Sequence, residues 1–443
     1  MDSQIFEIAS PTKIFFRCAI PAMISMAVGS LYQIADGVFV GRFIGGDALA
    51  AVNLIMPLIT IVFAISNMIA TGASVRVSML LGQGARERAS CIFTFVLKVI
   101  FVISLVVGVF GFIFAEQIVR LFGDGATEEA IQYGITYIRV YAIFNPIMPI
   151  AFATDNFLRI CGKETISMWL NIIPQLLNIV LDIILIAFLG QRLWAAAFTS
   201  CISITLAAIV TLLLFKDKRF DLYYAKGKIS IHEFLRLLSN GTSAFMEEIA
   251  MSVMSVVFNF YLLKYGGTTG VATFSVLMYV DSFVGMLVFG MCDSLQPSIS
   301  YCYGAGRFDK VKALLKRIMI VGSLLAVISF IFMFFVGQYV ATFFIKPEDT
   351  ELMKMSLEAM TIFSFSYLFG WVDMVVSSFF TAIEKPIYAM ILSLLGTLVF
   401  PIGSLMILTR FFELNGVWLS STASGLFIAI VAIMMLRLIS QKK

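Results

Sequence analysis

Residues 93–115 read FTFVLKVIFVISLVVGVFGFIFA, and this stretch decides the class of fold. The run holds a single charged side chain, Lys98. A helix that crosses the hydrocarbon core of a bilayer needs about 20 consecutive apolar residues. The stretch is therefore long and apolar enough to span a membrane as a helix.

The rest of the chain repeats this pattern. Its 443 residues are 60% hydrophobic and 13% charged, with a mean hydropathy of +0.98. A soluble domain carries about 25% charged residues. This composition excludes a soluble enzyme, a nucleic-acid-binding protein and a disordered chain. The net charge of +4 adds no nucleic-acid signal, because the basic residues lie in loops beside the apolar runs.

Twelve apolar runs are predicted to be transmembrane helices, and the basic residues between them set the orientation. With the N-terminus inside, 22 of the 31 basic residues lie in cytoplasmic segments and eight lie outside. Because cytoplasmic loops carry an excess of Lys and Arg, we predict that both termini are cytoplasmic. The predicted spans are residues 14–38, 48–72, 93–115, 133–157, 166–189, 193–215, 240–262, 270–294, 318–338, 359–381, 387–409 and 414–436.

The two halves of the chain resemble each other at a constant offset of 222 residues. This offset places Gly82 on Gly304 and Gly84 on Gly306, among other matches. Because each half holds an even number of spans, both halves start on the same side of the membrane as parallel repeats. We predict an all-α integral membrane fold with a six-helix bundle over residues 1–215, a cytoplasmic linker over 216–238 and a second six-helix bundle over 239–443.

Sequence motifs of enzymatic chemistry are missing. The chain has no G-x-x-x-x-G-K-[ST] phosphate loop and no G-x-S-x-G nucleophile elbow. Its one histidine, His232, lies in the charged linker and cannot form an H-E-x-x-H zinc site. The six cysteines form no C-x-x-C pair, so we interpret them as small buried hydrophobes rather than metal ligands. We predict that the chain is not an enzyme.

Several short motifs resemble those of a known transporter family. Residues 32–42 read YQIADGVFVGR, residues 45–51 read GGDALAA and residues 72–76 read GASVR. Gln296-Pro297 also precedes Gly304-Ala305-Gly306. With the six-plus-six repeat, these motifs resemble the MATE (multidrug and toxin extrusion) transporters over essentially the whole chain, and most of all the DinF-like, MepA-type prokaryotic branch.

This resemblance implies a fold and a function. The two bundles would form a V around a central cavity in the prokaryotic cell (inner) membrane. The protein would export lipophilic, often cationic drugs or toxins by alternating access, in exchange for H+ or Na+ and with no other cofactor. Its partners would be these small molecules and the lipid bilayer, with no nucleic acid, and it is predicted to be monomeric.

Two acids, Asp36 and Asp182, lie late in outward-running spans and so in the outer half of the membrane. A charge at mid-membrane costs roughly 2.5 kcal/mol or more, so such residues are functional candidates by default. Asn178 shares a helix face with Asp182, and Ser200 lies at a similar depth on the next span. The resemblance implies that these four residues bind the coupling cation, either a proton or Na+.

A second group of acids lies in the inner part of the second half. Glu247 and Glu248 are on the seventh span and Asp373 is on the tenth. The resemblance implies a second cation or substrate site here, although two adjacent glutamates point about 100° apart and cannot both face one side. Flexible thioethers suit surfaces that re-pack around different ligands. The residues predicted to line a drug cavity are Tyr32, Gln33, Met254 and Met278.

Two other functions stay open at this point. A flippase for a lipid-linked precursor would need a strongly cationic cavity for pyrophosphate, and few basic residues apart from Lys98 lie within the predicted spans. A receptor or assembly scaffold that transports nothing would have no need of carboxylates within the membrane.

Overall fold

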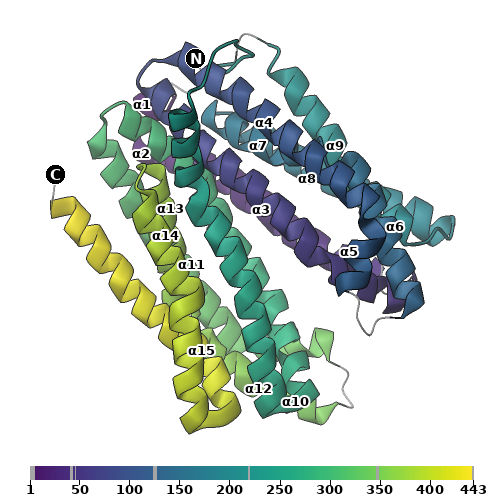
Figure 1. Cartoon of the computed structure of the whole chain (residues 1–443). Coiled ribbons are helices and arrows are strands. Elements are labelled where there is room, and N and C mark those ends of the chain that lie inside the picture. The colour runs from purple at the N-terminus through teal and green to yellow at the C-terminus, as the bar shows by residue number, and fades with distance from the viewer. Residues whose placement is uncertain are drawn as a thin grey trace. The chain divides into compact units, whose positions relative to one another are not determined.

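The computed structural model is built of helices, joined mostly by short connections (Figure 1). It describes residues 5–39, 43–44, 46–122, 127–217, 220–345 and 349–441. Within these ranges, the side chains of residues 34–39, 46, 47, 49, 50, 53, 54, 57, 58, 338, 340, 343, 344 and 439–441 are not described. Helices suit the apolar runs because a bilayer offers no hydrogen-bond partner to backbone groups outside a helix.

The helices follow one another along both halves of the chain. The first half forms α1 (Ile5–Ile8), α2 (Pro11–Phe39), α3 (Gly46–Gly82), α4 (Arg86–Ile113), α5 (Ala115–Phe122), α6 (Glu128–Phe144), α7 (Met148–Ile160), α8 (Glu164–Asp182), the π-helix η3 (Ile183–Phe188) and α9 (Leu193–Leu214). The second half forms α10 (Ile231–Gly304), α11 (Phe308–Phe344), α12 (Thr350–Ser364), α13 (Tyr367–Ala382), α14 (Pro386–Leu394), the π-helix η4 (Leu395–Val399) and α15 (Phe400–Gln441).

The described helices confirm the twelve predicted spans. Eight of them are long and apolar enough to cross a membrane, and the bent pairs α6–α7 and α12–α13 raise the number to ten. The two longest segments are each interrupted once, α10 at Gly267 (φ 59°, ψ −155°) and α15 at Glu413 (φ 48°, ψ −122°). These breaks fall between predicted spans, and dividing α10 and α15 there gives twelve.

The chain folds into two compact units. Unit 1 comprises residues 1–241 and 297–308, and unit 2 comprises residues 242–296 and 309–443. In unit 1, small residues such as Ala48, Ala51 and Ala197 are buried in the apolar core and let helix backbones approach closely. In unit 2, the core gathers around the buried Trp418. The bundle and linker boundaries predicted from the sequence remain predictions.

The predicted linker is an ordered strap in the structure. Its residues 220–230 run without helix and lie along the first turns of α4 within unit 1. Arg86 Nε donates to the backbone oxygen of Asp221 at 2.8 Å, and Arg88 Nη1 donates to that of Lys228 at 3.0 Å. The Arg86 guanidinium also stacks over the ring of Tyr223 at 5.3 Å. These contacts hold the strap to the helix.

Unit 1 contains a helix crossing that only glycine permits. A Cβ on Gly82 of α3 would lie 2.2 Å from the backbone oxygen of Tyr301 near the end of α10. Conversely, a Cβ on Gly304 would lie 2.3 Å from the backbone oxygen of Met79. The two pairs are related by the 222-residue offset, so this crossing has the symmetry of the repeat.

A second crossing of the same kind joins α3 to the start of α10. A Cβ on Gly72 would lie 1.9 Å from the backbone oxygen of Leu237, and one on Gly241 would lie 1.8 Å from that of Met68. Unit 1 therefore holds both ends of α10 against α3 by direct backbone contact, whereas residues 242–296 of that helix belong to unit 2.

Candidate functional site

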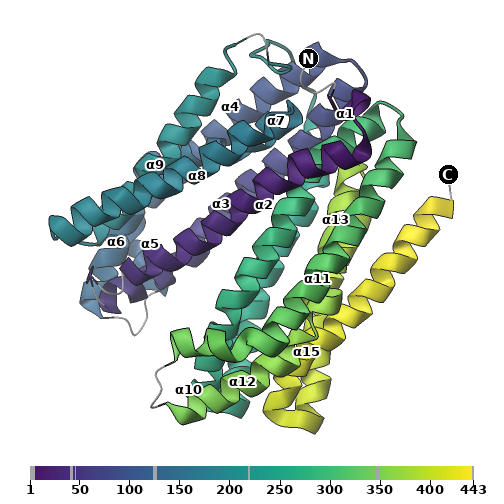
Figure 2. The ribbon, with the colours of Figure 1, turned by 180° about the vertical axis from the view of Figure 1, so that it is seen from behind.

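The best-formed polar site lies in unit 1, where α8 packs against both α2 and α9 (Figure 2). Asn178 and Asp182 share one face of α8, because residues four apart are neighbours on a helix. Both side chains are buried. The α-helix ends at Asp182 and continues as the π-helix η3. Local π-helical turns frequently occur at functional sites.

Hydroxyl groups from the neighbouring helices complete this site. Thr199 Oγ1 donates to Asp182 Oδ1 at 2.5 Å and accepts from Asn178 Nδ2 at 3.3 Å. The same Asn178 amide donates to Ser200 Oγ at 2.9 Å, and the Tyr32 hydroxyl lies 3.5 Å from that oxygen. We call these five residues the Asp182 cluster. It joins α2, α8 and α9 through side chains alone.

Thr199 was missed by the sequence reasoning. The resemblance placed the hydroxyl of the sixth span at Ser200, which does contact Asn178. The partner of Asp182 is instead Thr199, which is fully buried. Consecutive residues on a helix point about 100° apart. The side chains of Thr199 and Ser200 nevertheless both contact α8. The adjacent Thr-Ser pair was the available signal, but the sequence could not choose between its members.

The remaining predicted residues on α2 have different outcomes. Asp36 lies in the helix, but its side chain is outside the described part of the structure. Tyr32, one turn earlier, belongs to the Asp182 cluster. Gln33 is exposed and, among the described residues, forms no hydrogen bond with that cluster. The cation-binding and drug-cavity roles of these residues stay predictions.

The second predicted group of acids lies in unit 2. Glu247 and Asp373 are close enough for their charges to interact. Asp373 Oδ2 packs directly on the backbone of Gly396 in the π-helix η4, where a Cβ would lie only 2.0 Å away. Asp373 Oδ1 is buried without a hydrogen-bond partner among the described residues. The structure therefore brings Asp373 and Glu247 together, and Glu248 follows on the same helix.

The two methionines predicted to line a drug cavity pack in the apolar core of unit 2. Met254 is buried within this core, and Met278 is a partly buried neighbour of it. Around them lie aromatic side chains, including the stacked rings of Phe258 and Phe274, whose centroids are 5.3 Å apart. Their role in drug binding stays a prediction.

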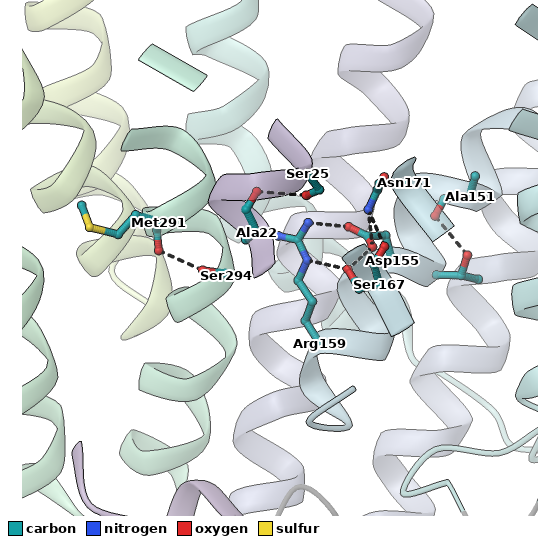
Figure 3. A network of polar contacts seen from close by, with 10 residues as sticks. Ala22, Ser25, Ala151, Asp155, Arg159, Ser167, Asn171, Met291 and Ser294 are labelled. Carbon is teal, nitrogen blue, oxygen red and sulfur yellow. Dashed lines mark hydrogen bonds and ion pairs between the residues drawn. The ribbon is translucent and has the colours of Figure 1, made fainter. Parts of the chain in front are cut away.

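A second polar group in unit 1 was not foreseen. Asp155 and Arg159 of α7 form an ion pair at 2.6 Å between Oδ2 and Nη2. Asp155 Oδ1 accepts hydrogen bonds from the Ser167 hydroxyl and, at 2.9 Å, from Asn171 Nδ2, both on α8. Figure 3 shows the four side chains converging, and we call them the Asp155 cluster. The i, i+4 spacing of Asp155 and Arg159 was its sequence signal.

The family model MatE matches residues 21–184 and again residues 243–405. The two matches start 222 residues apart and together cover most of the chain. The chain belongs to the MATE family. This result confirms the resemblance found in the sequence, and the doubled match confirms the internal repeat.

Individual relatives of this MATE protein agree with the family match. It is 24% identical to the multidrug export protein MepA of Staphylococcus aureus (strain MSSA476), over 100% of this chain and 97% of that protein. Its fold is similar to that of a MATE protein crystallised in complex with MaL6, with a TM-score of 0.93, 23% identity and coverage of 98% and 97%. An outward-facing multidrug resistance MATE family transporter gives a TM-score of 0.90 at 24% identity, with coverage of 98% and 96%.

The chemistry of the Asp182 cluster suits a small hard cation. Its acceptors are a carboxylate, an amide oxygen and hydroxyl oxygens, which are the ligand types that hard cations prefer. Asn178 Oδ1 is buried and has no hydrogen-bond partner among the described residues. Across those residues, no group of three or more His, Cys, Asp or Glu side chains could hold a metal ion. The binding of a coupling cation, H+ or Na+, by these residues stays a prediction.

Proposed function

We propose that this MATE protein is a secondary exporter of lipophilic, often cationic drugs or toxins, driven by H+ or Na+ exchange through alternating access. The observation that carries the proposal is the Asp182 cluster, a buried carboxylate within a predicted transmembrane span. Such a charge is expensive in a membrane and marks ion or proton pathways by default. The multidrug export activity named for the MepA relatives supports the same class of substrate.

In this proposal the coupling site comprises the four residues named from the sequence, Asp36, Asn178, Asp182 and Ser200, together with Thr199. Because side chains from α2, α8 and α9 meet in the Asp182 cluster, occupancy by a cation changes how these helices pack. A ligand shifts a conformational equilibrium only through a difference in its affinity for the two states. Repacking around the occupied site supplies that difference and links cation binding to drug release.

The acids of unit 2 form a second site in this scheme. Asp373 and Glu247, with Glu248 beside them, bind either a second cation or the positive charge of a substrate. Met254 and Met278 adapt an apolar surface to substrates of different shape. The protein works as a monomer in a prokaryotic cell membrane, with both termini in the cytoplasm.

Transport by purified protein in liposomes tests the proposal. A fluorescent aromatic cation is loaded, and its export is followed under a pH gradient and, separately, under a Na+ gradient. We expect one of the two gradients to drive export by the wild type. Asp36→Asn and Asp182→Asn should each abolish this export, and the double variant should be little worse than either single one, because residues that act as a unit are not additive.

Glu116→Gln is the matched control, because it removes an exposed carboxylate from α5 of the same unit. It should export at the wild-type rate. The proposed function is wrong if the wild type exports under neither gradient. The proposed site is wrong if Asp182→Asn, folded and inserted normally, keeps the wild-type rate.

A further inference from the structure

One face of α8 is polar over nearly its whole length. Ser167, Asn171, Asn178 and Asp182 fall at intervals of four, seven and four residues. At 100° per residue they lie within about 60° of one another around the helix axis. This polar stripe starts in the Asp155 cluster and ends in the Asp182 cluster, about 22 Å away at 1.5 Å per residue.

Between the two clusters, buried polar atoms line the seam where α8 packs against α9. Asn178 Oδ1 on α8 and Ser203 Oγ on α9 have no hydrogen-bond partner among the described residues. Gln175 Oε1 on α8 is also buried without one, but its amide group lies beside Gly29 of α2. Ser203 is 1% exposed and lies one turn from Thr199 on the same face of its helix. A buried polar atom without a hydrogen bond destabilises the fold. Such atoms are usually hydrogen-bonded by buried water molecules, each with two to four polar partners.

Pro174 leaves a further hydrogen-bond acceptor free on α8. It lies inside α8, on the polar stripe between Asn171 and Asn178. Proline has no N–H, so the carbonyl four residues earlier, at Leu170, receives no helical hydrogen bond from it. This carbonyl belongs to the stretch of α8 between Asn171 and Asn178, a distance of about 10 Å along the helix.

The Asp155 cluster provides an acceptor at the far end of the seam. The Asp155 side chain is 16% exposed, whereas its partner Arg159 is only 2% exposed. Within the described contacts, Arg159 is the charged group that faces Asp155, with Ser167 and Asn171 as neutral donors. Of the two ionic groups, the carboxylate is thus the one with access to surrounding water. The predicted orientation places this end of α8 at the cytoplasm.

We propose that the coupling ion is a proton and that it leaves the Asp182 cluster through unit 1, along the α8–α9 seam, to Asp155 and then to cytoplasmic water. This relay rests on the proposed function and names its ion and its exit route. One proton is lost by the carboxyl group of Asp182, and one proton reaches the cytoplasm. Asp155 accepts and releases that proton and returns to a carboxylate paired with Arg159.

The packing of the seam favours a proton over Na+. Asn178, Thr199 and Ser203 are buried where α8 packs against α9, and a hydrated metal ion is much larger than the single waters that buried polar groups hold. A proton needs only a chain of hydroxyls, amides and ordered waters at hydrogen-bond distances. The relay also separates the path of the proton from that of the drug.

Two variants test the relay without leaving a buried charge unpaired. The double variant Asp155→Asn/Arg159→Gln removes the whole ion pair, and Asn171→Leu fills the stripe with an apolar side chain. Each is reconstituted in liposomes with an internal pH dye. Gradient-driven export, proton movement per drug moved and drug-for-drug exchange without a gradient are measured for each. We expect export and proton movement to fall about tenfold or more, as for loss of a positioned proton carrier, while drug-for-drug exchange continues at the wild-type rate.

Thr154→Val is the matched control. Thr154 precedes Asp155, and its hydroxyl lies 2.8 Å from that of Thr211 in a buried pair outside the seam. This variant should behave like the wild type in all three measurements. If the two test variants also export normally, the relay is wrong. If they lose drug-for-drug exchange along with export, the Asp155 cluster only joins α7 to α8, and the relay is again wrong.

Two outcomes with the wild type distinguish failure of the relay from failure of the proposed export function. Export driven by Na+ without proton movement overturns the relay and leaves the exporter intact. Absence of export under either gradient overturns the proposed function, and the relay with it.

Discussion

The glycine crossing between α3 and the end of α10 makes a quantitative prediction. In Gly82→Ala, the new Cβ would lie 2.2 Å from the backbone oxygen of Tyr301 and 2.9 Å from the backbone nitrogen of Ala305. Both neighbours are backbone atoms and cannot rotate away as a flexible side chain could. The two helices must therefore move apart, and the contacts around the crossing must loosen with them.

The expected size of the effect follows from this overlap. Forcing an extra group into a well-packed interior usually costs about 1–3 kcal/mol, and a clash with backbone puts this variant at the upper end. A domain of 150–250 residues loses about 2–4 °C of melting temperature per kcal/mol, so we expect a decrease of roughly 6–12 °C. Gly304→Ala should show a similar decrease, because its Cβ would meet the backbone of Met79 in the same way.

The assay is thermal unfolding of the purified protein in detergent, followed by the fluorescence of tryptophan or of a thiol-reactive dye. Gly111→Ala in α4 is the control, since a Cβ there would have nothing within 4 Å. Replacing a glycine inside a helix by alanine stabilises by about 0.5–1 kcal/mol where the Cβ meets nothing, so the melting temperature of this variant should stay level or rise. If Gly82→Ala and Gly304→Ala both have the same melting temperature as Gly111→Ala, the backbones at this crossing are not in contact.

Three further predictions concern the strap, a buried cysteine and the membrane orientation. Arg86→Gln removes the hydrogen bond to the backbone oxygen of Asp221, so trypsin should cleave after Lys226 faster than in the wild type. Burial raises the pKa of the Cys161 thiol to about 12. Almost no reactive thiolate then exists at pH 8, and mass spectrometry should find iodoacetamide on this residue only after unfolding. A cysteine in place of Lys216 should be labelled only from the cytoplasm, and one in place of Lys354 only from outside, as the basic-residue bias requires; the reverse pattern would overturn the orientation.

Much of the fold was determined by the sequence itself. A long apolar run can satisfy its backbone in a bilayer only as a helix, so run lengths were enough to predict twelve spans. The same reasoning predicted where the long segments α10 and α15 are interrupted, because the breaks at Gly267 and Glu413 fall between predicted spans. The 222-residue repeat was also visible without coordinates and reappears in the doubled family match.

The docking of the connecting segments was decided only by the tertiary structure. The charged linker gave no apolar pattern that would predict an ordered strap, because its contacts use the backbone oxygens of Asp221 and Lys228. Backbone acceptors carry no sequence signal. The same holds for the crossing of Gly82 and Gly304, since each glycine meets a main-chain oxygen whatever the side chain there.

The candidate site was likewise predicted in part from the sequence and in part decided by the tertiary structure. Helical spacing alone placed Asn178 and Asp182 on one face, and the cost of a charge in the membrane made Asp182 a functional candidate. Spacing within one helix says nothing about which residue of the neighbouring helix lies opposite. That depends on how the helices are rotated and how deeply they interlock, which is set by side-chain packing along their whole length. For this reason the contact of Thr199 with Asp182, and the contacts of Asp155 at the other end of the polar stripe, could be identified only from the tertiary structure.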